Sequence, residues 1–327
     1  MMTFLSVVAR IVTAALLMAM AGAVSAQQAY PSKPIRLIVP YAAGGATFVL
    51  AQLLGQKLTE SLGQPVVMDV RPGVNGIIGS EAMTKSAPDG YTLLLVASSH
   101  VVTGALVKNL PYDSIKDFAP VATVTFSEYV FAVYPKFPAK NVKELVDLCK
   151  SKPGAFNFST AGEGSQGHLG NALFNIRTGI NVQHIAYKGS GPALADVVSG
   201  QVQMTFQPPS IVAPFLKGGK LRALAITGKH RLQSLPEVPT FAEEGVPDLD
   251  VTSWYALLAP VGIPNQIVAK LAQAINKNLA LPEMKEKLDG IGMEPYISTT
   301  EQFGALMKAD LAKFAKIAKD ANIQPMD

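Results

Sequence analysis

The arrangement of strands, glycine-rich turns and helices constrains the fold of this chain most, because the same pattern occurs twice. The first unit has an apolar strand at 35–39 and a helix from Thr47, and glycines join them. The second unit has a strand at 156–160 and a helix that ends near Arg177, and the turn 161–165 joins them. Strands that alternate with helices are typical of parallel sheets covered on both faces. The sequence therefore predicts an α/β fold.

The two units are expected to form two lobes that the chain crosses between twice. The apolar segments 121–133 and 251–258 are the expected crossovers. Lobe one would comprise residues 27–125 and 252–327, and lobe two residues 126–251. Further strands are expected at 65–70, 91–97, 182–186 and 202–206, and amphipathic helices over 264–319.

The first 26 residues are typical of a secretory signal. Arg10 precedes an apolar run at 11–24, and small residues lead up to Ala26. We expect cleavage after Ala26 and a periplasmic protein. An uncleaved anchor is the alternative, although the run is shorter than the ~20 apolar residues of a membrane span. The uncharged stretch 91–107 is expected to be a buried strand and a turn.

Composition and motifs argue against several classes of protein. Lys and Arg number 28 and Asp and Glu 24, without a basic cluster, so no nucleic-acid partner is expected. The one cysteine, Cys149, excludes an internal disulfide and is expected to be buried in a helix over 142–150. No two of the four histidines are spaced i, i+4, so neither a metal site nor a cofactor is expected.

A G-x-G-x-x-G pattern is present but lacks its usual companion. Gly162, Gly164 and Gly167 form it after a strand, yet no acidic residue follows about twenty positions later, around 179–184. We therefore do not expect a dinucleotide site.

The paired glycine turns are the candidate binding elements. A glycine-rich turn at the start of a helix exposes backbone N–H groups, and the helix dipole adds about half a positive charge. Such a turn can hold an anion without Arg or Lys. Two turns at the carboxyl ends of strands could grip one small carboxylate from both sides. The alternative is that these glycines only permit tight turns.

The motifs of the mature chain resemble those of the Bug family, the extracytoplasmic solute receptors of tripartite tricarboxylate transporters. The resemblance spans essentially the whole mature chain. The motifs that carry it include Tyr30-Pro31-Ser32-Lys33-Pro34, Gly44-Gly45-Ala46-Thr47, Ala87-Pro88-Asp89-Gly90-Tyr91, Asn109-Leu110-Pro111-Tyr112-Asp113, Ser159-Thr160-Ala161-Gly162 and Tyr187-Lys188-Gly189-Ser190.

This resemblance implies a type II periplasmic-binding-protein fold, with mainly parallel sheets in two lobes joined by two hinge crossovers. It also implies a non-catalytic receptor that holds a small organic carboxylate and delivers it to the permease subunits of a membrane transporter. The implied ligand-binding residues are Tyr41, Ala43, Gly44, Gly45, Thr47, Phe48, Ser98, Ser99, His100, Ser159, Thr160, Ala161, Gly162, Ser165, His168 and Gln207.

Three departures from the family pattern bear on the ligand. Phe48 stands where the family usually has Asp, Gln52 where it commonly has Arg, and Gln207 where Asp or Asn is frequent. Without the Asp, the site loses an acceptor for an ammonium or hydroxyl group, and the ring adds apolar area. We expect a more apolar ligand, such as an aromatic carboxylate. The alternative is that Phe48 turns into the core.

Two other functions stay open at this point. Glu163, Ser165 and His168 lie close together in the sequence, which would suit an exported hydrolase acting on a carboxylate substrate. The second open function is that of a binding domain that serves a sensor rather than a transporter.

Overall fold

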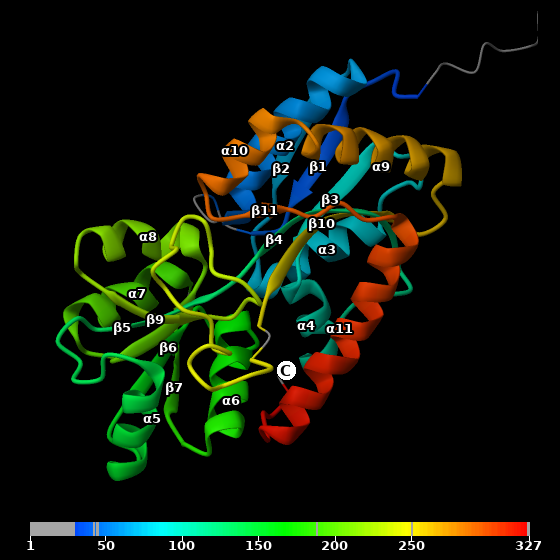
Figure 1. Cartoon of the computed structure of the whole chain (residues 1–327). Coiled ribbons are helices and arrows are strands. Elements are labelled where there is room, and N and C mark those ends of the chain that lie inside the picture. The colour runs from blue at the N-terminus through cyan, green and yellow to red at the C-terminus, as the bar shows by residue number, and fades with distance from the viewer. Residues whose placement is uncertain (1–29, 42, 44–45, 188, 250, 326–327) are drawn as a thin grey trace, which may run out of the picture.

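The structure is a computed structural model that describes residues 30–41, 43, 46–187, 189–249 and 251–325. The predicted signal and the glycine pair Gly44-Gly45 lie outside the described residues. The described chain forms two lobes, each built around one β-sheet (Figure 1). Among the described helices, none has the length and apolar character that a membrane crossing requires.

The sheet of lobe one has six strands in the order β11-β4-β10-β3-β1-β2. β1 pairs in parallel with β2 and β3, whereas β10 pairs antiparallel with β3 and β4. The strand expected at 35–39 is β1, with the same bounds. The strands are β1 (Ile35–Val39), β2 (Val66–Val70), β3 (Thr92–Ala97), β4 (Phe118–Ser127), β10 (Ser253–Pro260) and β11 (Glu294–Pro295).

Helices cover both faces of this sheet, which explains the continuous apolar run of β3. Leu93 and Leu95 pack toward α2 and α9, while Leu94 and Val96 pack toward the opposite face with α4 and α11. A strand buried on both faces needs no polar alternation. The helices of lobe one are α2 (Ala46–Leu62), α3 (Ile77–Thr84), α4 (Ser99–Leu106), α9 (Asn265–Leu279), α10 (Pro282–Asp289) and α11 (Thr300–Asp320), and the short η1 (Val74–Gly76) precedes α3.

The sheet of lobe two has five strands in the order β7-β6-β8-β5-β9. Its strands are β5 (Val130–Val133), β6 (Asn157–Thr160), β7 (Gln183–Ala186), β8 (Met204–Gln207) and β9 (Arg222–Ile226). Its helices are α5 (Val142–Ser151) and α6 (Gln166–Thr178) on one face, and α7 (Ser190–Ser199) and α8 (Pro209–Lys217) on the other. Cys149 is buried in α5, where burial raises the pKa of its thiol to about 11. It packs as a small apolar residue, as expected.

The α/β fold in two sheets is confirmed, and most strands of each sheet run in the same direction, with β10 and β11 reversed in lobe one and β5 reversed in lobe two. β6 pairs in parallel with β7 and β8, while β5 pairs antiparallel with β8 and β9. The reversed strands β5 and β10 are those that enter a lobe from the other one. A strand reached through a strand–helix–strand unit runs parallel to its neighbour, and these two are not reached in that way.

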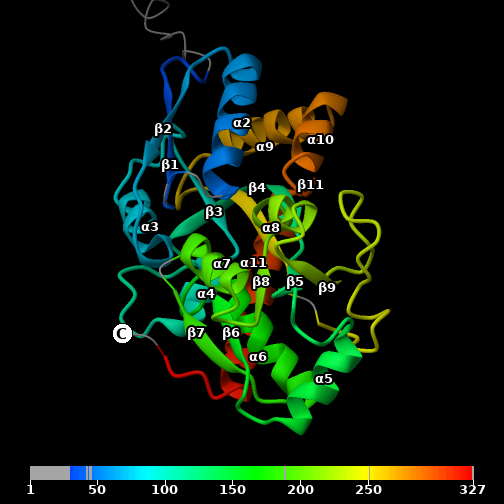
Figure 2. The same ribbon diagram turned by 90° about the vertical axis from the view of Figure 1, so that its left-hand side faces the viewer.

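The chain passes directly between the lobes from β4 to β5, and again between β9 and β10. Thr227 ties the two passages together, since its Oγ1 accepts from the Tyr129 amide at 2.9 Å and donates to the Val251 carbonyl at 2.9 Å. α11 extends from lobe one to contact α6 of lobe two (Figures 1 and 2). Domain boundaries near 126 and 252 remain a prediction.

The stretch 91–107 differs from its expectation. It forms β3 and then helix α4, where the sequence suggested a turn after the strand. The amides of Val101 and Val102 both donate to the Ser98 carbonyl, at 3.1 and 3.3 Å, which begins the helix directly after the strand. The serines at 98–99 therefore sit at the start of a helix.

Candidate functional site

The lobe-one side of the candidate site begins where β1 ends. The Tyr41 hydroxyl lies 2.9 Å from Ser99 Oγ and accepts a hydrogen bond from the Ala97 amide at 3.2 Å. Burial raises the pKa of Tyr41, so this hydroxyl stays protonated. Thr47 is buried in the first turn of α2, and Phe48 beside it is half-buried. Ala43 is exposed.

Ser98 and Ser99 begin α4 at the carboxyl end of β3. Ser98 is fully buried, and its Oγ lies 3.0 Å from Ser253 Oγ on β10. Ser99 is only half-buried, and its Oγ faces Tyr41. The two serines thus connect the ends of β1, β3 and β10.

His100 lies inside the core of lobe one, although the sequence suggested a place in the ligand site. Its ring stacks on Tyr112 at 5.8 Å and meets the edge of Phe118 at 4.7 Å. Nε2 contacts the Ser114 carbonyl at 3.0 Å and the residue is 1% exposed. An α-helix turns its successive side chains by about 100°, so His100 faces the core while Ser99 does not.

The lobe-two side is the turn between β6 and α6. Gly162 (φ 141) and Gly164 (φ 68) have positive φ values that side chains disfavour. Ser165 caps α6, because its Oγ accepts from the His168 amide at 3.3 Å. The Ser165 amide donates to Gly162 O at 3.2 Å, and the Ala161 carbonyl accepts from Gly189 N at 3.0 Å.

Two amides at the start of α6 are available for a ligand. The Gly164 amide donates to His168 Nδ1 at 3.1 Å and is therefore occupied. Within the described parts of the chain, the amides of Gln166 and Gly167 have no hydrogen-bond partner. These two groups, at the positive end of a helix of 13 residues, form the anion-binding capacity of this turn.

The two turns face one another across the boundary between the lobes. The Gln166 side chain donates to Ser98 Oγ and, at 3.3 Å, to the Thr252 carbonyl. Asn75 Nδ2 donates to the Glu163 carbonyl at 3.4 Å, and the neighbouring Gly76 lies against the Tyr41 ring. Each of these hydrogen bonds joins the lobe-two turn or the start of α6 to residues of lobe one.

The other predicted residues of lobe two lie close to this boundary but differ in their roles. Thr160 is buried and bonds within lobe two, to Gly162 and His184. Ser159 is buried too, and its Oγ has no partner among the described residues. Gln207 ends β8 and donates to Thr205 Oγ1 at 3.4 Å.

Sequence reasoning missed Gln166, Ser253 and Ser210. Gln166 is the first residue of α6, and its Oε1 is buried without a partner in the described chain. Ser210 Oγ, near the start of α8, is also buried without a partner in the described chain. The position of Gln166 directly after a glycine turn was a usable signal, whereas the pairing of Ser253 with Ser98 depends on the order of the strands.

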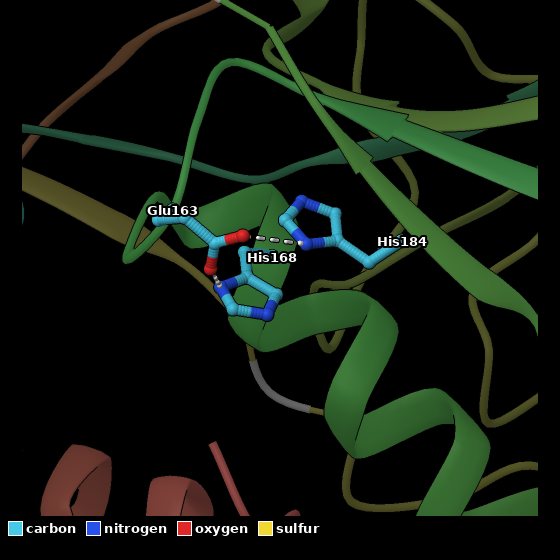
Figure 3. Close-up of side chains that lie close together, drawn as sticks. All are labelled: Glu163, His168 and His184. Carbon is cyan, nitrogen blue, oxygen red and sulfur yellow. Dashed lines mark ion pairs between the residues drawn. The ribbon is translucent and has the colours of Figure 1, made fainter. Parts of the chain in front are cut away.

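Glu163, His168 and His184 form a second cluster on lobe two (Figure 3). His168 Nδ1 lies 3.3 Å and His184 Nδ1 3.5 Å from the Glu163 carboxylate oxygens. Ser165 Oγ contacts the His168 backbone rather than its ring, so no serine is activated by a histidine base here. The geometry thus fails the arrangement that a hydrolase of this kind requires.

Comparisons with known proteins agree with this architecture. Residues 50–323 match the family model described as tripartite tricarboxylate transporter family receptor. Protein BugT of Bordetella pertussis is 38% identical over 293 residues, which cover 89% of this chain and 90% of BugT.

Two solved structures of ligand complexes are also similar. A protein of R. palustris solved with adipate is 33% identical, with a TM-score of 0.84, over 91% of this chain and 100% of that one. MatC of Rhodopseudomonas palustris, solved with malate, is 30% identical, with a TM-score of 0.77, over 88% and 99%.

The family consists of periplasmic receptors that bind solutes, and the structural neighbours are binding proteins rather than enzymes. This chain, whose match to the family model extends over most of its length, belongs to the Bug family of tripartite tricarboxylate transporter receptors.

Proposed function

We propose that this receptor captures a small organic carboxylate between the turn after β1 and the turn after β6. The observation that carries the proposal is the pair of amides, of Gln166 and Gly167, that have no partner among the described residues. The Gln166 side chain reaches Ser98 across the lobe boundary. Backbone amides at a helix start bind carboxylates without a cationic side chain. No Arg or Lys is therefore needed at the site.

Buried polar atoms supply further hydrogen-bonding capacity at the same ends of the strands. Ser159 Oγ, Gln166 Oε1 and Ser210 Oγ are buried and have no partner in the described chain. Buried polar groups are nearly always satisfied, by protein or by water. A bound carboxylate with its ordered waters would satisfy these atoms.

In the proposed cycle the two lobes open to admit the ligand and close around it. The Gln166 contacts to Ser98 and Thr252 hold the lobes together, and a ligand would enter when these contacts separate. Removal of residues 1–26 would release the receptor into the periplasm, and permease subunits of a tripartite transporter would receive the ligand. Binding at a hundredfold excess over the dissociation constant would stabilise the folded receptor by ~2.7 kcal/mol.

A titration tests this function. The untagged protein purified from periplasm is titrated with adipate, malate, citrate, aspartate, benzoate and terephthalate while its unfolding temperature is recorded. We expect at least one carboxylate to raise the unfolding temperature and to be recovered unchanged. Chemical conversion of the carboxylate, or no shift with any of them, would contradict the proposal.

We propose that the Phe48 ring contacts the ligand and makes the site favour an apolar carboxylate. The ring is half-buried at the start of α2, and it belongs to none of the hydrophobic cores of the described residues. Phe48→Ala should therefore weaken binding of terephthalate or benzoate by roughly 0.5–1.5 kcal/mol beyond the lost burial.

The matched control for this change is Val49→Ala, at an exposed neighbouring position. Isothermal titration calorimetry measures both variants. Tightest binding of aspartate by the wild-type protein, or unchanged aromatic affinity in Phe48→Ala, would show that Phe48 does not select the ligand.

A further inference from the structure

The cluster of Glu163, His168 and His184, which we call the carboxylate–histidine triad, lies at the turn that precedes α6 (Figure 3). Glu163 belongs to the turn, His168 to the first turn of α6 and His184 to β7. One nitrogen or oxygen from each residue lies within 4.8 Å of the others. The two imidazole rings stack at 3.9 Å, with an angle of 10° between their planes.

The Thr160 hydroxyl contacts both Gly162 O, at 3.2 Å, and His184 Nε2, at 2.5 Å. When the hydroxyl donates to Gly162 O, its oxygen accepts from His184 Nε2, and the ring proton is on Nε2. A neutral imidazole with its proton on Nε2 has a lone pair on Nδ1. That Nδ1 faces a Glu163 oxygen at 3.5 Å.

His168 is fixed in the same tautomer by the backbone. The Gly164 amide donates to His168 Nδ1 at 3.1 Å, so this nitrogen is an acceptor as well. It also faces Glu163, at 3.3 Å. Nδ1 of both rings therefore lies beside the carboxylate without a ring proton between them, although the His168 lone pair is used by the Gly164 amide. A cation between these groups would stabilise this arrangement.

We propose that the carboxylate–histidine triad binds a divalent transition-metal ion, with zinc as the best fit to its donors. Zinc accepts two histidines and one carboxylate and keeps a fourth position for water. Donors of a tetrahedral site with bonds of ~2.0–2.1 Å lie roughly 3.4 Å apart. His168 Nδ1 lies 3.3 Å from Glu163 Oε2 and His184 Nδ1 lies 3.5 Å from Glu163 Oε1, so each histidine is near this spacing from one oxygen of the carboxylate.

The surroundings supply what a zinc site needs beyond its donors. Histidine ligands usually donate their second ring N–H to a neighbour, and the Thr160 hydroxyl lies within hydrogen-bond distance of His184 Nε2.

An ion can reach the triad from solvent. The Glu163 side chain is 55% exposed, and a cavity of about 620 Å³ has His168, His184 and Asn171 in its wall. Asn171, one turn after His168 on α6, has a buried Oδ1 without a partner among the described residues. This oxygen could accept a hydrogen bond from a metal-bound water.

Binding requires one small rearrangement. A metal ion lies in the plane of each imidazole that coordinates it, and the two rings are almost parallel. One ring must therefore rotate, and His168 would exchange its bond from the Gly164 amide for the metal.

Calorimetry with Zn²⁺ on the untagged protein, stripped with EDTA and free of carboxylate ligand, tests this site independently of the proposed transport function. We expect one Zn²⁺ per chain and a loss of affinity of at least about tenfold in Glu163→Gln. Because Glu163 is largely exposed, this variant should keep the wild-type unfolding temperature. His184→Gln should lose zinc as well, and the visible absorption of bound Co²⁺ should report tetrahedral coordination in the wild type but not in these two variants.

His230→Gln is the matched control, because His230 is an exposed histidine away from the triad. It should leave zinc affinity unchanged. Equal affinities of the wild type and Glu163→Gln, or an equal loss in His230→Gln, would overturn the proposal and show nonspecific binding to surface groups.

Discussion

Replacing Ser99 by aspartate should weaken carboxylate binding about a hundredfold to a thousandfold. Ser99 is half-buried beside the Tyr41 hydroxyl, at the proposed lobe-one contact with the ligand. Two unit charges about 4 Å apart repel by roughly 4 kcal/mol near a protein surface, which corresponds to about a thousandfold in affinity. Calorimetric titration with the tightest-binding carboxylate of the panel measures this effect.

Ser99→Asn is the control, because asparagine has nearly the same shape as aspartate and carries no charge. It should lose no more than about tenfold. Both variants should fold, since aspartate and asparagine are well tolerated at the start of a helix such as α4. Similar affinities for the two variants would mean that the anion does not bind near Ser99.

Acidification should destabilise the receptor through His100. Burial lowers the pKa of this histidine from 6.5 to about 4. The unfolded chain takes up the proton near pH 6.5, whereas the folded chain resists it until about pH 4. The contribution to stability is thus present above pH 6.5 and is lost as the pH falls toward 4, by about 2 kcal/mol at pH 5.

The difference between the wild type and His100→Gln isolates this effect, because His168 and His184 have lowered pKa values and act in the same direction. Urea denaturation at pH 7 and pH 5 measures it, with His230→Gln as the exposed control. The wild type should lose about 2 kcal/mol more than His100→Gln between the two pH values. Equal losses would show that His100 is already protonated or accessible to solvent.

The elements with strong local signals could be predicted from the sequence. β1 has its expected bounds, and α6 begins after the glycine turn and ends one residue past Arg177. The alternation of strands and glycine turns is a local property, so it survives in the fold. The family resemblance then supplied the two-lobe architecture, which the solved relatives confirm.

Features that depend on contacts distant in sequence were not predictable in this way. The family resemblance placed His100 in the ligand site together with Ser98 and Ser99, yet Tyr112 and Phe118 enclose it. His168 and His184 are sixteen positions apart and showed no metal-ligand spacing. They meet only because β6 and β7 pair in parallel beside α6.

The antiparallel direction of β5 and β10 was also not predictable, because it depends on pairing with strands that are distant in sequence. Neither strand belongs to a local strand–helix–strand unit. The sequence also did not show which amides of the lobe-two turn stay without a partner. Gly164 and Ser165 use their amides within lobe two, and Gln166 and Gly167 keep theirs unpaired among the described residues.

A crystal structure of the protein with its tightest-binding carboxylate tests the central claim most directly. The account predicts a carboxylate oxygen within hydrogen-bond distance of the Gln166 or Gly167 amide, with the rest of the ligand contacting Tyr41, Ser99 or the α2 start in lobe one. A ligand that contacts only one lobe, or that leaves both amides without a partner, would contradict it.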